Sequence, residues 1–216
     1  MSEVWFTADT HFGHGNIIKY CNRPFLSAEE QRLVAEDPRG RWRVSSETVQ
    51  RHDSTLIDEI NAVVTKHDQL WILGDFCWGK EEDATRYVDR IKCKNLNLVW
   101  GNHDHRSIEP LFKKVMEQGM IKVRGQKIWL NHYPMRSWDG KFHGSWQLYG
   151  HVHDRLTSED QENSSQLTKD VGVDACDYKP VSFSELSEYM KPRLEAFEEA
   201  KARFVSGDES QGRKVD

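Results

Sequence analysis

The chain has 216 residues, of which 37% are hydrophobic and 30% charged, and its formal net charge at pH 7 is −5. This length suits one domain with a full core. We expect that domain at residues 1–205, with an exposed insertion at 27–45 and a disordered tail at 206–216. No apolar run approaches the roughly 18 residues that span a bilayer, and the first residues do not resemble a signal peptide. The negative net charge also argues against a large non-specific nucleic-acid interface.

The cysteines are scattered and have no C-x-x-C spacing, which is typical of reduced thiols. Together with the lack of an apolar span, this predicts a cytoplasmic protein without a membrane partner. The oligomeric state is left open.

The first half of the chain predicts strands that alternate with helices. Residues 3–8 form a short β-rich apolar run, and residues 16–20 a short helix. Apolar residues at steps of three and four predict an amphipathic helix over 46–64. Strands at 70–73 and 96–100 enclose a helix at 84–91, which is the spacing of a βαβ unit in a parallel sheet.

The second half begins with a predicted helix at 108–117, after which the period changes. Residues 120–123 and 127–130 predict a hairpin, and 147–150 and 171–173 predict further strands, with a loop at 155–170. Ser182 and Glu185 form a capping-box pattern at the start of the last helix. Pro192 is expected to kink or split that helix.

Five polar segments occur in a fixed order, most of them just after a predicted strand. They are Asp9-Thr10-His11, Gly74-Asp75, Gly101-Asn102-His103-Asp104, His132 and Gly150-His151-Val152-His153. Because the carboxyl ends of parallel strands meet at one edge of a sheet, the first three segments should lie together. The later histidines follow other strands, so a second sheet could face the same cleft. The glycines before Asp75, Asn102 and His151 allow close backbone approach to a ligand.

These segments supply three carboxylate or amide groups and four imidazoles. The carboxylate and amide groups belong to Asp9, Asp75 and Asn102, and the imidazoles to His11, His132, His151 and His153. Oxygen and nitrogen donors suit Mn²⁺, Fe or Zn²⁺. Seven donors exceed what one tetrahedral ion takes but suit two ions that share a carboxylate. Loop caps and a structural zinc site are the competing interpretations, although a structural zinc site usually contains cysteines.

The order D-x-H, G-D, G-N-H-D, H, G-H-x-H resembles the calcineurin-like metallophosphoesterase family. The short segments at 6–14, 22–25 and 132–136 resemble its small bacterial and phage members. The resemblance implies an α/β fold of two sheets packed face to face and flanked by helices, with a dinuclear metal site at the carboxyl edge of the strands. It implies a hydrolase with two divalent ions, Mn²⁺ being preferred and Fe, Zn²⁺ or Ni²⁺ being alternatives.

The resemblance also implies a role for each site residue. The implied ligands are Asp9, His11 and His153 for one ion, Asn102, His132 and His151 for the other, and Asp75 for both. A hydroxide bridging the ions would attack phosphorus in line, without a phosphoenzyme. His103 would protonate the leaving oxygen, and Asp104 would fix the orientation of His103.

The expected substrate is a phosphate ester, with a phosphodiester of nucleotide or nucleic-acid type preferred. Arg23, Arg136 and His14 are candidate substrate contacts, since the arginine fork matches phosphate, although a solvated arginine is also common. Trp138, Trp146 and Phe142 could stack on a base or could simply pack. The alternatives are a phosphomonoesterase of small substrates and a metal-binding regulatory module without turnover.

Overall fold

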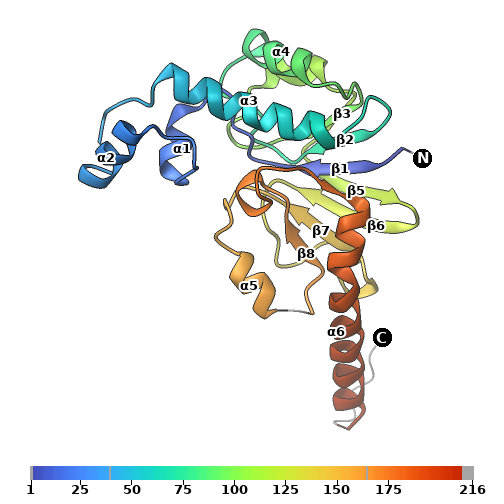
Figure 1. Ribbon diagram of the computed structural model, residues 1–216. Coiled ribbons are helices and arrows are strands. Elements are labelled where there is room, and N and C mark those ends of the chain that lie inside the picture. Colours follow the sequence, from blue (N-terminus) through green and yellow to red (C-terminus); the bar gives the residue numbers. More distant parts are fainter. Residues whose placement is uncertain (1, 39, 164, 211–216) are drawn as a thin grey trace.

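The computed structural model describes residues 2–38, 40–163 and 165–210. Two sheets pack face to face, and helices lie outside them (Figure 1). The first sheet has the order β4-β3-β2-β1-β9, and its first four strands in sequence run parallel. Its strands are β1 Val4–Thr7, β2 Gln69–Ile72, β3 Leu96–Val99, β4 Lys114–Met116 and β9 Val181–Ser182. The predicted α/β sandwich of two sheets is confirmed.

The second sheet has the order β5-β6-β7-β8. Its strands are β5 Gln118–Val123, β6 Gln126–Asn131, β7 Trp146–Tyr149 and β8 Thr168–Asp170. β5 and β6 form the predicted antiparallel hairpin, whose two-residue turn places Arg124 at φ 47° and Gly125 at φ 94°. β6, β7 and β8 run parallel, so their carboxyl ends share an edge, as in the first sheet.

Helices α3 and α4 cover the outer face of the first sheet (Figure 1). The helices are α1 Gly15–Tyr20, α2 Ala28–Glu36, α3 Ser46–Val63, α4 Glu81–Arg90, α5 Thr157–Glu162 and α6 Phe183–Ser210, with short 3-10 turns η1 Arg106–Leu111, η2 Lys141–His143 and η3 Val173–Ala175. The side chain of Ser45 caps α3, and the predicted box between Ser182 and Glu185 begins α6. The expected helices at 16–20, 46–64 and 84–91 are therefore confirmed.

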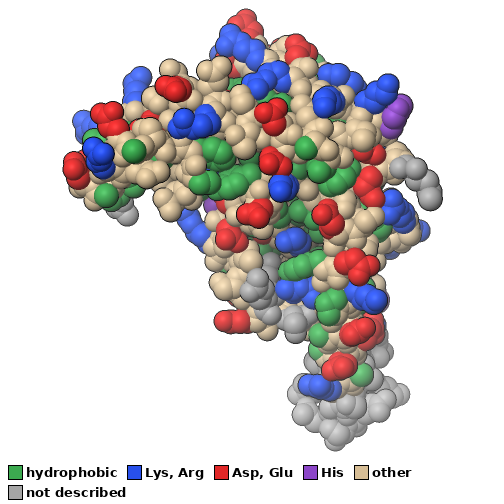
Figure 2. All heavy atoms as spheres, in the orientation of Figure 1, with side chains coloured by type: hydrophobic (Ala, Val, Ile, Leu, Met, Phe, Trp, Pro, Cys, Tyr) green, Lys and Arg blue, Asp and Glu red, His purple; other side chains and the backbone are tan. Residues whose placement is uncertain are grey.

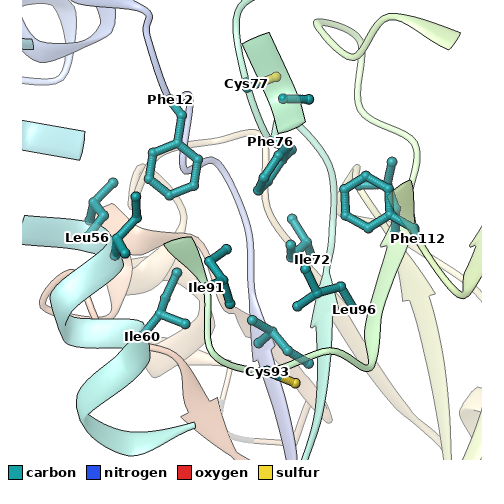
Figure 3. Close-up of a cluster of buried hydrophobic side chains, with 14 of the residues drawn as sticks. Phe12, Leu56, Ile60, Ile72, Phe76, Cys77, Ile91, Cys93, Leu96 and Phe112 are labelled. Atoms are coloured by element: carbon teal, nitrogen blue, oxygen red, sulfur yellow. The ribbon is translucent and has the colours of Figure 1, made fainter. Parts of the chain in front are cut away.

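Two hydrophobic clusters fill the layers on either side of the first sheet. Leu70 and Ile72 of β2 face the helices, whereas the alternating Trp71 and Leu73 face the second sheet. Figure 3 shows Ile72 in one cluster with Leu56 and Ile60 of α3. Because both faces of this sheet are covered, its strands are mainly apolar, and their ends become the accessible places for polar groups.

The predicted helix at 108–117 is wrong. The structure has η1 there, followed by β4, which pairs in parallel with β3. Pro110 lies inside η1 and lacks the N–H that an α-helix would use. The apolar spacing is satisfied differently, since Ile108 and Phe112 pack into the helix-facing cluster while β4 extends the sheet.

In three other places the observed elements differ from the predicted ones over a few residues. The last strand of the second sheet is at 168–170 and not at 171–173, and α5 and β8 both fall in the expected loop at 155–170. α6 is not split at Pro192 and continues to Ser210, so residues 206–210 of the expected tail are helical. The rest of that tail, residues 211–216, lies outside the described residues.

The insertion at 27–45 contains α2 and is mostly exposed, but it holds the buried carboxylate of Glu30. All four cysteines are free, and Cys77 is buried as expected. On the face shown in Figure 2, Lys and Arg side chains are interspersed with Asp and Glu. Within the described ranges, none of the helices has a stretch long and apolar enough to cross a membrane.

Candidate metal centre

The strand order of the first sheet brings the first three polar segments together. β2 lies between β1 and β3, and all three strands run in the same direction. Asp9, Asp75 and Asn102 follow the carboxyl ends of these strands within a few residues. Asp75, which follows the middle strand, therefore lies between the other two.

The second sheet delivers the remaining histidines to the same edge. His132 directly follows β6, and His151 comes two residues after β7. The two sheets are joined here, because the backbone N–H of His151 donates to Asp9 Oδ2 at 2.8 Å and that of Val173 donates to the carbonyl of Ala8 at 3.1 Å. The candidate residues from the two sheets therefore lie at the same edge of the fold.

Three groups of potential ligand atoms occur in the described residues; Cys21, His153 and Asp174 form one, and the other two contain the predicted ligands. Within each group the atoms are no more than 4.8 Å apart, and of these two the first group is Asp9, His11 and His153, and the second is Asp75, His132 and His151. Asp75 Oδ2 lies 3.3 Å from His11 Nε2 and 3.4 Å from His132 Nε2, so one carboxylate oxygen contacts both the first and the second group. Asn102 Oδ1 lies 3.1 Å from His132 Nε2 and completes the second group.

Buried atoms without hydrogen-bond partners show that these residues fit a cation. Asp9 Oδ1 and His11 Nε2 are both buried and have no hydrogen bond. The 3.3 Å contact from His11 Nε2 to Asp75 is an ion-pair distance that lacks hydrogen-bond geometry. Unpaired buried polar atoms are costly, and a divalent ion would satisfy both. The mixed oxygen and nitrogen donors suit Mn²⁺, Fe or Zn²⁺.

The backbone at this edge is unusual. The φ angles are 56° for Asp9, 47° for His11, 54° for Asp75, 72° for His151 and 49° for His153. Positive φ is uncommon outside glycine, although Asp and His tolerate it better than most residues. Such strained positions cluster at functional sites, where the surrounding fold enforces them.

The glycines before the ligands permit close approach, as expected. A Cβ at Gly74 would lie 2.4 Å from His132 Nδ1, and one at Gly101 would lie 2.2 Å from Asp75 Oδ1. A Cβ at Gly150 would lie 2.6 Å from Asp9 Oδ2. Any side chain at these three positions would therefore displace a ligand.

Burial decides the direction of the pKa shifts of Asp9 and His11, two members of the first group. Burial raises the pKa of Asp9 to about 7, although His153 and His132 oppose it, and burial lowers the pKa of His11 to about 4. Burial also favours a raised pKa for Asp75, but contacts with His11 and His132 outweigh it, so that this pKa is lowered. The neutral His11 ring and the ionised Asp75 are the protonation states that bind metal.

Three of the candidate ligand histidines are held through their second ring nitrogen. His153 Nδ1 lies 2.6 Å from Asp174 Oδ2, His132 Nδ1 lies 2.8 Å from the carbonyl of Leu73, and His11 Nδ1 lies 3.3 Å from His14 Nδ1. Such contacts fix the orientation of a ligand ring and leave the other nitrogen for the metal. His14 therefore lies behind a ligand, and burial lowers its pKa to about 4, which keeps its ring neutral.

Asp174 was missed by the sequence reasoning. It follows the apolar run 171–173, which is the same strand-end position that singled out Asp9 and Asp75. Burial favours a raised pKa for Asp174, but His153 and Arg23 lower it to about 2. Asp174 is therefore an ionised partner of His153.

Arg23 is not a substrate clamp, contrary to the prediction. Its side chain is 1% exposed, and its Nε and Nη2 donate to Asp174 at 2.8 and 2.7 Å. Its other N–H groups lie against the carbonyls of Asp9 and Thr10 and against His52 Nε2, which leaves no donor for a substrate. Arg23 instead ties the Asp9 turn to Asp174.

His103 lies at the exposed side of the centre. Its ring centroid is 5.3 Å from that of His11, and its backbone N–H donates to Asp75 Oδ1 at 2.9 Å. Asp104 does not orient this ring as expected. Its carboxylate accepts the backbone N–H groups of Asp75, Phe76 and Gly101 at 2.9, 2.8 and 2.9 Å, so it fixes the turn that carries Asp75.

The remaining candidates are divided by burial. Arg136 is exposed and lines a cavity of about 500 Å³ between the loop after His132 and α5. Trp138 and Trp146 are only 6% and 3% exposed, so packing explains them, whereas Phe142 is 70% exposed. The exposed aromatic rings that contact the centre belong to Trp78 and Tyr133, which the sequence reasoning did not select.

Comparison with known proteins identifies the family of this metal centre. The sequence model of the calcineurin-like phosphoesterase superfamily domain matches residues 51–169, which is more than half of the chain. The chain belongs to the calcineurin-like phosphoesterase superfamily, as the motif order predicted. It is thus a hydrolase acting on ester bonds, from a family that uses divalent metal ions. The segment with Asp9 and His11 lies before the matched residues, and the fold joins it to them.

Relatives of similar length are known. An uncharacterized protein of Methanocaldococcus jannaschii is 31% identical over 183 residues, covering 84% of this chain and 88% of the relative. The gene 66 protein of Mycobacterium phage L5 is 25% identical over 206 residues, covering 81% of this chain and 88% of the relative. The crystal structure of a protein of unknown function from Aquifex aeolicus has a TM-score of 0.60 at 21% identity, over 87% of this chain and 99% of that one, and shares the fold.

Proposed function

We propose that the protein is a dinuclear metal-dependent phosphodiesterase. Asp9, His11 and His153 would hold one ion, Asn102, His132 and His151 the other, and Asp75 both. Bound divalent ions would activate water for in-line attack on phosphorus and neutralise charge on the phosphoryl oxygens. Mn²⁺ is our preferred ion for these mixed oxygen and nitrogen donors.

The position of Asp75 carries this proposal. Its Oδ2 atom is within 3.4 Å of the Nε2 atoms of both His11 and His132, each from a different ligand group. A carboxylate in contact with two groups of ligands is the arrangement that two adjacent ions require. A structural zinc site needs four ligands in one group and offers no reason for this arrangement.

His103 is the proposed proton donor to the leaving oxygen. It is exposed, it lies beside His11, and its backbone is anchored on Asp75. The imidazole can therefore reach a substrate bound at the centre without moving the ligands. An imidazole is suited to proton transfer near neutral pH.

The surroundings of the centre favour a diester over a monoester. Arg23, which donates to the carbonyl of the proposed ligand Asp9, is fully occupied by Asp174, His52 and backbone carbonyls. The exposed groups in ring contact with the ligand and catalytic histidines are instead the aromatic side chains of Trp78 and Tyr133. A diester has one negative charge and two organic substituents, which matches this rim better than a monoester dianion.

The test is hydrolysis of an aryl phosphodiester and the matching monoester by protein that has been stripped of metal and then given Mn²⁺. His103→Ala should lower kcat by at least about 100-fold, the usual size of a general acid–base contribution. Asp75→Asn should remove most of the Mn²⁺-dependent turnover, because the carboxylate proposed to bind both ions is lost. His105→Ala is the matched control, because His105 is an exposed neighbour whose side chain hydrogen-bonds to Ser107 and not to the proposed ligands.

A larger kcat/KM for the diester would support the proposal. A larger value for the monoester would replace it with a phosphomonoesterase. Two bound ions without turnover of either ester would instead favour a regulatory module, and failure to bind two ions would refute the dinuclear centre.

A further inference from the structure

Two exposed aromatic side chains border the metal centre. Large hydrophobic side chains that are exposed in the described residues are Tyr20 at 58%, Trp78 at 53%, Tyr133 at 43% and Phe142 at 70%. Trp78 and Tyr133 differ from the other two because their rings contact histidines of the centre. Exposed aromatic rings at a site are suited to binding another planar ring.

Trp78 lies in a preorganised position. Its backbone N–H donates to the carbonyl of Phe12 at 2.8 Å, and Cys77 forms a β-bridge with Phe12. The indole stacks on His14 with centroids 4.4 Å apart and planes 18° apart, and its centroid is 5.7 Å from that of His103. The half-exposed indole therefore lies beside the proposed proton donor.

Tyr133 lies beside the second group of candidate ligands, the one that contains His132 and His151. It follows His132 in sequence, and its ring makes edge contacts with His132 and His151 at centroid distances of 5.0 and 4.5 Å. Its hydroxyl donates to Asn102 Oδ1 at 3.3 Å. Three proposed ligands of one ion thus hold this ring at the surface.

We propose that Trp78 and Tyr133 are stacking platforms for planar rings on the two substituents of a phosphodiester. This inference rests on the proposed function. Trp78 takes the leaving substituent because it lies beside His103, which donates a proton to the leaving oxygen. Tyr133 takes the substituent that stays on phosphorus, because it contacts His132, His151 and Asn102 and lies away from His103 in the proposed arrangement.

The chemical class that fits is a phosphodiester whose substituents carry heteroaromatic bases. Stacking reads the planar face that every base has and is therefore tolerant of base identity. The platforms require no extended basic surface, which agrees with the net charge of −5 and with the interspersed charges in Figure 2.

The experiment compares esters that differ in one substituent at a time. Methyl p-nitrophenyl phosphate and thymidine 5′-p-nitrophenyl phosphate share the leaving group and differ in the retained one. Methyl trifluoroethyl phosphate has a non-aromatic leaving group. All three are tested with the Mn²⁺-loaded protein, and the bound Mn²⁺ of each variant is measured.

The Tyr133 variants test the contact with the substituent that stays on phosphorus. Tyr133→Leu keeps an apolar side chain against His151 but removes the ring. It should lower kcat/KM for the thymidine ester by about 10- to 100-fold, the range expected for one lost stacking contact, and change the methyl ester by less than about threefold. Tyr133→Phe should keep most of the preference for the thymidine ester.

The Trp78 variant tests the contact with the leaving group. Trp78→Leu should lower kcat/KM for both p-nitrophenyl esters by about 10-fold or more and leave the trifluoroethyl ester nearly unchanged. Tyr20→Leu removes an exposed ring elsewhere and should change none of the values.

The outcomes separate this inference from the proposed function. If the wild type hydrolyses none of the three esters, the proposed function fails. If it hydrolyses them but the platform variants reduce all esters equally, or lower turnover only in proportion to lost Mn²⁺, the platforms are refuted while the phosphodiesterase stands.

Discussion

At the scale of a single residue, Asp174 and Arg23 fix the orientation of His153, a proposed metal ligand. Its Nδ1 atom lies 2.6 Å from Asp174, and Arg23 lies 2.7 Å from the same carboxylate oxygen. Burial favours a lower pKa for His153, but Asp174 outweighs it and raises the pKa to about 10 in the metal-free protein. A metal at His153 Nε2 would replace a proton on a ring whose orientation Asp174 has already set.

Asp174→Asn should weaken metal binding without removing a ligand. Asparagine has nearly the same size, but it lacks the charge that orients and polarises His153. We expect Mn²⁺ affinity to fall about 10- to 100-fold, which is typical when the outer partner of a ligand histidine is lost. Calorimetric titration with Mn²⁺ measures this, with circular dichroism to establish that the variant is folded.

Asp177→Asn is the matched control, since Asp177 is exposed and three residues away. Equal Mn²⁺ affinity of Asp174→Asn and the wild type would show that the contact is only structural.

At the scale of elements, one carboxylate joins the beginnings of two helices. Glu30, in the first turn of α2, accepts the backbone N–H of Ser27 at 2.8 Å and that of Ser45 at 2.7 Å. It also accepts the Thr48 hydroxyl at 2.6 Å. Ser27 caps α2 and Ser45 caps α3, so the insertion is anchored to the fold through these hydrogen bonds.

Glu30→Gln should lower stability in a way that depends on pH. Burial favours a higher pKa for Glu30, but the hydrogen bonds from Thr48, Ser45 and Ser27 lower it to about 2, compared with 4.5 when unperturbed. A lowered folded pKa stabilises the protein above pH 4.5, and this contribution is lost as the pH falls from 4.5 towards 2. The loss caused by Glu30→Gln should be on the order of 1–3 kcal/mol at pH 7, as for a hydrogen bond to a charged group.

Urea unfolding between pH 2 and 7 would test this expectation. The difference between wild type and Glu30→Gln should shrink below pH 4.5, whereas Glu29→Gln, at an exposed position beside it, should show little difference at any pH. A constant difference across the range would contradict the role of the charged form.

At the scale of the whole molecule, the centre links two sheets that otherwise meet through their hydrophobic faces. Asp9, Asp75 and Asn102 come from the first sheet, and the later histidines come from the second. Ions at this edge would join both sheets, so metal binding should stabilise the complete fold and not only the loops.

Adding Mn²⁺ to metal-stripped protein should therefore raise Tm. At a concentration about 100-fold above Kd, one site adds about 2.7 kcal/mol. That corresponds to roughly 5–10 °C for a chain of this size. Scanning calorimetry measures the shift, and Asp75→Asn should lose most of it.

Ca²⁺ is the control ion, because it prefers oxygen ligands and this centre is rich in imidazole. Equal shifts with Ca²⁺ and Mn²⁺, or no shift with Mn²⁺, would contradict a site built from these residues.

Much of the fold could be predicted from local patterns. Apolar runs and helical spacing located β1, β2, β3, the hairpin of β5 and β6, and α3, because these elements bury a face that the sequence displays. The helix expected at 108–117 failed because a neighbouring strand and Pro110 decided the conformation of that segment. β8 was displaced for a similar reason, since pairing with β7 selects residues 168–170.

The sequence by itself determined the family, the two-sheet class of fold and the set of candidate ligands, because glycine, Asp, Asn and His at strand ends are visible as local patterns. Only the tertiary structure decided which long-range partners those residues meet. It buried Arg23 against Asp174, turned Asp104 to the backbone of the Asp75 turn, and left Trp78 and Tyr133 exposed at the centre. These outcomes depend on packing between segments far apart in the chain, and side-chain burial and partner choice are set only when those segments meet.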